Sequence, residues 1–226
     1  LFKDGSDPWG HPNTDWYGAT LKKWSPQQRH NLQIDGGTDD IKYLISLGYQ
    51  NQDAYYKNSA SGYKQYHFRI NLDANIHPYI KAQFGVLRRQ EARNSPTKSA
   101  GTIFRMLMRG NPTMPAYWPN GMPGPDIEHG ENPVVITTNE TGYNKDKRYY
   151  LQTNGQVDIT NPWVDGLKLT INASVDKYFR KGKNWQTPWY LYTWQDQYEA
   201  DGVTPKLIAG KRGPAEPRLT QSDEDQ

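Results

Sequence analysis

The sequence predicts an all-β protein built from antiparallel, up-and-down strands, and three observations support this fold class. First, apolar and polar residues alternate over several runs, as in strands with two different faces. Second, short turns join these runs in pairs, as in β-hairpins. Third, only 35% of the 226 residues are hydrophobic, yet 16 Tyr and 8 Trp are present. Such a chain suits half-exposed strands with amphipathic rings at a boundary better than a thick aliphatic core.

Residues 1–27 are rich in turn-forming residues and are predicted to form a loop with a short helix within residues 15–24. Asn13 or Thr14 is the expected N-cap of this helix, because either side chain can accept a hydrogen bond from a free backbone amide. Residues 1–5 carry no initiator Met and no signal peptide, and both ends are expected to be cut from a longer protein.

Three hairpins are predicted along the chain. They pair residues 29–35 with 41–50, residues 66–72 with 80–86, and residues 149–159 with 167–175. The alternation is clearest in the second hairpin, where apolar Phe68 is flanked by polar His67 and Arg69. Leu44 in the first hairpin is an exception, since it falls on the otherwise polar side. Each run predicts a strand with one apolar and one polar face, and about six strands are expected.

The connections between the strands differ in length at the two ends. Those at one end are short (36–40, 74–79 and 160–166), and those at the other end are long (1–27, 51–63, 89–147 and 180 onward). The longest contains several prolines and is expected to include a short helix at Ala100–Arg109. Such alternation is typical of transmembrane β-barrels with long extracellular loops. A one-sided sheet in water fits the pattern equally well, so both folds stay open at this point.

The composition and motifs argue against several classes of function. The net charge of +3 is mixed along the chain and gives no indication of nucleic-acid binding. The absence of Cys excludes disulfides and thiolate metal sites. No nucleophile elbow, phosphate-binding loop or paired His motif occurs, so we expect no catalytic residues, metal site, cofactor or enzyme activity. A carboxylate pair such as Asp196 with Glu199 is interpreted as part of a solvated loop.

The candidates for substrate binding come from the aromatic cluster 185–198 and from the polar side of the second hairpin. The flat rings of Trp185 and Trp194 can stack on sugars. Three neighbouring rings are instead interpreted as membrane-interface residues: Trp189, Tyr190 and Tyr192. His67 and Arg69 are expected to line a water-filled interior. The predicted substrate-binding residues are therefore Trp185, Trp194, His67 and Arg69.

Four segments, in order along the chain, resemble the barrel of SusC/RagA-family TonB-linked outer-membrane transporters. They are PNTDW at 12–16, RHNLQIDGG at 29–37 followed by KYLISLGYQNQ at 42–52, YHFRINLD at 66–73, and NPWVDGLK at 161–168. The His-Asn start, the Gly-Gly turn and the Gly-Tyr-x-Asn-Gln exit of the second segment form the most recognisable part. Single pieces are weak motifs, but the ordered set is fairly specific.

The resemblance implies a large transmembrane β-barrel of about 22 strands with an internal plug, located in the cell outer membrane. Residues 1–226 would then be part of the barrel domain, with the plug domain and the remaining strands absent from this sequence. The implied function is import of oligosaccharides or peptides, with a SusD-like surface lipoprotein as partner and the TonB complex as the energy source. The alternative is a secreted β-sheet module that binds carbohydrate through Trp- and Tyr-rich loops.

Overall fold

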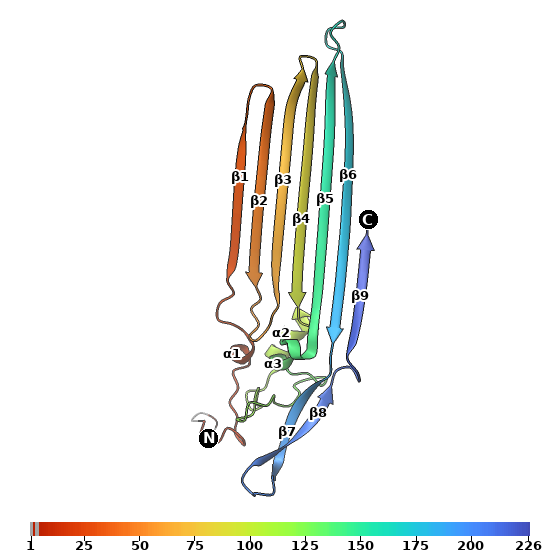
Figure 1. The fold of residues 1–226 in the computed structure, drawn as a ribbon. Coiled ribbons are helices and arrows are strands. Elements are labelled where there is room, and N and C mark those ends of the chain that lie inside the picture. The colour runs from red at the N-terminus through yellow and green to blue at the C-terminus, as the bar shows by residue number, and fades with distance from the viewer. Residues whose placement is uncertain (1, 3–4) are drawn as a thin grey trace.

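The computed structural model describes Phe2 and residues 5–226, and its dominant feature is a long antiparallel sheet (Figure 1). Within these residues seven strands pair in the order β1-β2-β3-β4-β5-β6-β9, and β7 and β8 form a separate ribbon. The strands are β1 Gln27–Gly37, β2 Ile41–Asp53, β3 Gly62–His77, β4 Ile80–Ser95, β5 Gly142–Thr160, β6 Lys168–Gln186, β7 Trp189–Tyr198, β8 Pro205–Arg212 and β9 Arg218–Asp225. The predicted all-β, up-and-down fold is confirmed, and the sheet is open, with β1 and β9 at its edges.

The cross-strand register gives this sheet two chemically different faces. One row across β1–β6 consists of Ile34, Ile45, Ile70, Val86, Thr153 and Val175. The corresponding row on the other side consists of Gln33, Ser46, Arg69, Leu87, Gln152 and Asp176. We call the two sides the apolar face and the polar face. Leu44 lies on the polar face, as the alternation predicted, between Asp35 and Asn71.

The apolar face is not covered by a second layer over most of its area. Leu32 on β1 is 56% exposed and Val175 on β6 is 67% exposed. The apolar face is therefore open both at the β1 edge of the sheet and five strands away. A patch of this extent on a water-soluble protein would be unusual. Within the part of the chain that the structure describes, no second sheet packs against it. The arrangement is that of a barrel wall with a lipid-facing side.

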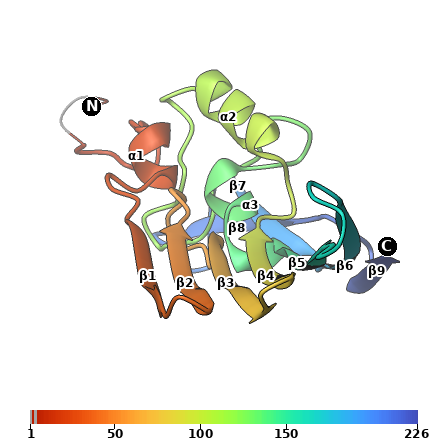
Figure 2. The ribbon, with the colours of Figure 1, turned by 90° about the horizontal axis from the view of Figure 1, so that it is seen from above.

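The two ends of the sheet differ as the connection lengths predicted. The turns of the three hairpins lie together at one end, here called the turn end, at the top of Figure 1. The helices and long connections gather at the opposite end, the loop end. These helices are α1 Trp16–Thr20, α2 Ala100–Arg109, α3 Pro133–Ile136 and the 3-10 turn η1 Asn139–Thr141. Seen along the strands, α1, α2 and α3 lie on the same side of the sheet (Figure 2). Among the described residues, no helix is long and apolar enough to cross a lipid bilayer.

The helix predicted within residues 15–24 is shorter, and its predicted cap is wrong. The N-cap is Asp15, whose Oδ1 accepts a hydrogen bond from the amide of Gly18 at 2.9 Å. Thr14 instead donates its hydroxyl hydrogen to the carbonyl of Met114 at 2.7 Å, which ties the first loop to the longest one. Residues 1, 3 and 4, on which the expectation for the start of the chain partly rests, lie outside the described residues.

The long connections are shorter than predicted because the strands continue beyond the alternating runs. The gap predicted at 89–147 is reduced to 96–141, since residues 89–95 of β4 pair with residues 144–150 of β5. The region from 180 onward is not one loop, because β6 continues to Gln186 and β9 pairs with its last eight residues. Both faces are polar in these extensions, so the alternation that marks a half-buried strand is lost.

The connections at the loop end share one apolar core. Its members come from every long connection: Trp16, Tyr56, Ile103, Met106, Leu107, Ala116, Val134, Val135, Ile136, Trp189 and Leu191. Helix α2 contributes Ile103, Met106 and Leu107, which recur at three- and four-residue spacing and are almost fully buried. Burial raises the pKa of the Tyr56 hydroxyl, so this group stays neutral inside the core. The connections at the loop end therefore pack together into one unit, here called the cap, and do not fold independently of each other.

We predict that Met106→Ala in the full-length protein destabilises this cap by about 2–5 kcal/mol, because it opens a cavity in a closely packed core. Met108→Ala is the matched control, since Met108 lies on the same helix but is 71% exposed. Amide hydrogen exchange of α2 measures the effect. Equal protection of α2 in both variants would contradict the packed-cap interpretation.

Candidate functional site

The polar face carries a row of rings and cations near the loop end. Gly48, His67, Arg89, Tyr150 and Tyr178 are consecutive cross-strand partners in this row. The guanidinium carbon of Arg89 lies 4.2 Å from the ring centroid of Tyr150, and the rings of Tyr150 and Tyr178 are 4.9 Å apart. Arg89 and Tyr178 flank the ring of Tyr150, and these contacts restrain all three side chains. Together they give the polar face a flat surface with polar groups.

Glycine at position 48 determines how His67 lies in this row. A Cβ atom at residue 48 would come within 1.8 Å of the Cε1 atom of His67, so the imidazole occupies the space that any other residue would need. Arg69 lies one row nearer the turn end, between Ser46 and Leu87, and is exposed. The structure therefore places both predicted residues on the polar face.

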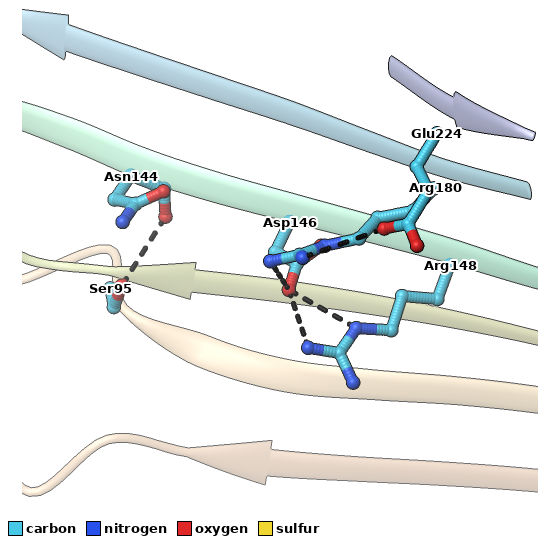
Figure 3. A network of polar contacts seen from close by, with 6 residues as sticks. All are labelled: Ser95, Asn144, Asp146, Arg148, Arg180 and Glu224. Atoms are coloured by element: carbon cyan, nitrogen blue, oxygen red, sulfur yellow. Dashed lines mark hydrogen bonds and ion pairs between the residues drawn. The ribbon is translucent and has the colours of Figure 1, made fainter. Parts of the chain in front are cut away.

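A charged network adjoins this row (Figure 3). Asp146 accepts hydrogen bonds from Nε of Arg180 at 2.9 Å and from Nη2 of Arg148 at 2.9 Å. Glu224 on β9 lies 3.9 Å from Arg180 and adds a weaker ion pair. A single carboxylate thus sits between two guanidinium groups (Figure 3). The remaining N–H groups of the two arginines suit carboxylate or hydroxyl groups of a ligand.

A further charged pair lies beside this network. The Nε atom of Arg89 is 3.0 Å from a carboxylate oxygen of Glu91, close enough for an ion pair but without the alignment of a hydrogen bond. At this distance the two opposite charges attract each other whatever the angle between them. Sequence reasoning missed Arg89 and the Asp146 network, because they lie in strand extensions without alternation. Tyr150 lies within the predicted run 149–159, but its role is visible only once its partner Arg89 is known.

Three tryptophans meet at the loop end. The rings of Trp9 and Trp118 stack with centroids 5.3 Å apart, and Trp194 approaches Trp9 edge-on at 5.7 Å. Trp118 is buried and donates its indole N–H to the carbonyl of Tyr192 at 2.8 Å. Trp9 and Trp194 are half-buried, so parts of their rings remain accessible. This tryptophan cluster combines three distant segments of the chain, and of these rings the sequence indicated only Trp194.

Trp185 does not join either of these groups. It lies on the apolar side of β6, opposite Tyr143 of β5 and Leu219 of β9. The prediction that Trp189 lies at a membrane interface is wrong, because this side chain is buried in the core of the cap. The four predicted binding residues therefore do not form one site: His67 and Arg69 share a face, Trp194 lies in the loops, and Trp185 lies apart.

A different set of rings crosses the apolar face in one line. This aromatic row comprises His30, Tyr49, Tyr66, Tyr149 and Phe179, with Gln90 between Tyr66 and Tyr149. Neighbouring rings are in contact distance, for example Tyr49 and Tyr66 at 5.1 Å. Rings at one level across a strand wall mark a lipid–water interface. The row could have been found from the sequence only with the register known.

Metal chemistry gains no support from the described residues. No group of three or more metal-ligating side chains occurs in residue 2 and residues 5–226.

Comparison with known proteins places this geometry in context. No protein-family model matches the sequence. TonB-dependent receptor P26 of Formosa agariphila is 31% identical over 143 residues, which cover 60% of this chain and 14% of that receptor. The chain therefore spans only about a seventh of the length of this relative.

Two solved structures share the fold. The RagAB peptide transporter covers 78% of this chain with a TM-score of 0.56 and 19% identity. The RagAB peptide importer in its open-open state covers 80% with a TM-score of 0.59 and 22% identity. In each case the matched part is 20% of the larger chain.

The relative found by sequence is a TonB-dependent receptor, and the two structures that share the fold are of a peptide transporter. TonB-dependent receptors are outer-membrane proteins, in agreement with the location predicted from the sequence. The resemblance noted in the sequence is therefore confirmed: the chain is similar to one stretch of the β-barrel of a SusC/RagA-like TonB-dependent transporter.

Proposed function

We propose that residues 1–226 form part of the barrel domain of an outer-membrane transporter that imports oligosaccharides or peptides with energy from TonB. The observation that carries this proposal is the pair of faces on one sheet. The apolar face is uncovered across its width, whereas the polar face carries the Arg, Tyr and His row. A barrel wall needs these two faces, because one contacts lipid and the other contacts water.

The height of the apolar face supports the placement in a membrane. On β5 it extends from Tyr149 in the aromatic row to Ile159 beside the turn end. These ten steps correspond to about 33 Å along the strand, or about 25 Å across the membrane at a tilt of about 40°. This height matches the apolar band of about 25 Å that outer-membrane barrels have. In this orientation the loop end is extracellular and the turn end is periplasmic.

The polar face and the tryptophan cluster are the proposed substrate contacts. Accessible edges of Trp9 and Trp194 suit sugar rings or aromatic side chains, and the arginines beside Asp146 suit carboxylates and hydroxyls. We assign substrate contact to Trp194, His67 and Arg69. Trp185 shares no surface with these residues, so it has no place in the proposed path.

The proposed partners follow from the relatives. The resemblance in the sequence implies a SusD-like surface lipoprotein, which is the proposed partner at the loop end, and the TonB-dependent receptor supports TonB as the source of energy. No bond is made or broken in this proposal, and the work is movement of the substrate. A carbohydrate-binding module free in water is less compatible with the structure, because it would leave the apolar face exposed to solvent.

Expression of the full-length gene tests the proposal. We expect the protein to fractionate with outer membranes and to need detergent for solubility. Cells that carry it should take up members of an oligosaccharide series or a peptide library, and a TonB deletion should abolish uptake. Uptake that persists without TonB, or a stable monomer in plain buffer, would contradict the proposal.

The assignment of faces predicts opposite responses to an added charge at two adjacent residues of β3. Ile70→Arg places a cation in the middle of the apolar face and should destabilise the full-length protein by about 2–4 kcal/mol in lipid vesicles. Asn71→Arg places the same charge on the polar face and should have a much smaller effect. Denaturant unfolding of both variants in vesicles measures the difference. Similar costs for the two would mean that the faces are misassigned.

The tryptophan cluster predicts a loss of substrate affinity in the full-length transporter. Trp194→Ala should weaken binding of the imported substrate by about tenfold or more, as expected for a central aromatic residue of a binding surface. Trp194→Phe should restore most of this affinity. Trp163→Ala is the control, because Trp163 is 87% exposed at the turn end. Calorimetric titration with the transported substrate measures all three, and an unchanged affinity in Trp194→Ala would exclude the contact.

A further inference from the structure

Lysines face each other directly on the apolar side of β5 and β6, just beyond the aromatic row. Lys147 is the cross-strand partner of Lys181, and Lys145 is the partner of Lys183. Lys64 of β3 lies level with Lys147, with Ala92 of β4 between them. We call these five residues the lysine cluster. Like charges directly opposite each other destabilise an antiparallel pair, so this arrangement favours a bound anion between the strands.

The protein itself supplies little negative charge to the lysine cluster. Among the ion pairs of residue 2 and residues 5–226, none involves a member of the cluster. Lys145 and Lys181 lie instead over the rings of Tyr143 and Phe179. Asp223 of β9 faces Lys181 in the register but forms no ion pair with it, and Asp225 pairs with Lys177.

Part of the lysine cluster lines an open hollow of about 450 Å³. Lys64, Lys145 and Lys147 contribute to it, and one wall is the connection between β2 and β3 at residues 59–61. Asn94 fixes this wall, because its side-chain amide donates to the carbonyl of Ala60 at 2.8 Å. The hollow is as large as a typical small-molecule site.

The single carboxylate in the hollow does not neutralise it. Asp53 lines the hollow, but its carboxylate is held by Lys22 at 2.6 Å. Arg93 lines the hollow as well, but its register position beside Asp146 is on the polar face, so its charge does not belong to the lysine cluster. The hollow therefore keeps an excess of positive charge on the outer side of the sheet, opposite the face that carries the proposed substrate contacts.

We propose that the lysine cluster binds the phosphate groups of a phosphorylated glycolipid of the outer leaflet, of the lipid A type. The cluster lies on the loop-end side of the aromatic row, which is the level of the head groups, while the apolar face below the row accommodates the acyl chains. Lysines at this level attract anionic head groups. This inference rests on the proposed placement of the chain in the outer membrane.

Native mass spectrometry of the full-length protein in detergent, titrated with lipid A, tests the proposal. We expect the unmodified protein to bind phosphorylated lipid A at least tenfold more tightly than lipid A from which the phosphates have been removed. Equal binding of the two lipids overturns the proposal. Complete displacement of lipid A by inorganic phosphate also overturns it, because the site would then be one for a free anion.

Charge-removing variants locate the site. The triple variant Lys64→Gln, Lys145→Gln and Lys147→Gln should bind phosphorylated lipid A at least tenfold more weakly, since each lysine near a membrane surface contributes roughly fivefold. The control Lys42→Gln, Lys81→Gln and Lys168→Gln removes three charges from the polar face near the turn end and should bind as the parent does. An equal loss in both variants, or no loss in the first, overturns the proposal.

Two features of the design separate the possible failures. If the triple variant does not insert, the comparison of phosphorylated and dephosphorylated lipid A on the unmodified protein still decides the matter. If the unmodified protein is a detergent-dependent, TonB-driven importer that does not distinguish the two lipids, only the lipid site is wrong. If it is soluble without detergent, the proposed function itself fails.

Discussion

The cross-strand register of β1 to β6 is the constraint on which the rest of the structure depends. Successive side chains of a strand point to opposite sides, so a slip of one residue between two strands would move an entire set of apolar side chains to the wrong face. In the row from Ile34 to Val175, the register instead keeps the isoleucine and valine side chains of neighbouring strands on one side, with Thr153 as the one hydroxyl residue among them. The aromatic row, the lysine cluster and the polar-face row that contains His67, Arg89 and Tyr150 are all consequences of this alignment.

The loop end follows a different organising principle. Its backbone is irregular, so its stability comes from side-chain burial around α2 and from a few long-range hydrogen bonds. Trp16 donates its indole N–H to the carbonyl of Asn111 at 2.9 Å, and Asn132 caps α3 while donating to the carbonyl of Pro125 at 3.0 Å. Buried polar groups with satisfied partners of this kind fix one conformation of a core. The molecule thus combines a regular antiparallel sheet with a loop-end cap that has a hydrophobic core of its own.

Sequence reasoning succeeded where a local pattern reports on a local structure. The alternation around Phe68, the turns of the three hairpins and the helix Ala100–Arg109 could all be predicted, because neighbouring residues determine them. Strand β9 and the far ends of β4 and β5 could not, since their partners are distant or both of their faces are polar. Strand β7 was missed because aromatic and apolar residues lie on both of its faces, so it shows no alternation. Arg89 on Tyr150, the two guanidinium groups on Asp146 and the stack of Trp9 on Trp118 need the register or the loop fold before they become visible.

The shared core of the cap has a consequence for attempts to change specificity by exchanging loops. Thr14 and Trp16 of the first connection bond to the backbone of the longest one, and Trp189 of β7 is buried in the same core. A graft of any one connection from a relative would leave cavities and unpaired donors in the connections that stay. The connections therefore have to be exchanged as one unit. Chimeric proteins should fold when all of the connections are transferred together onto the strands.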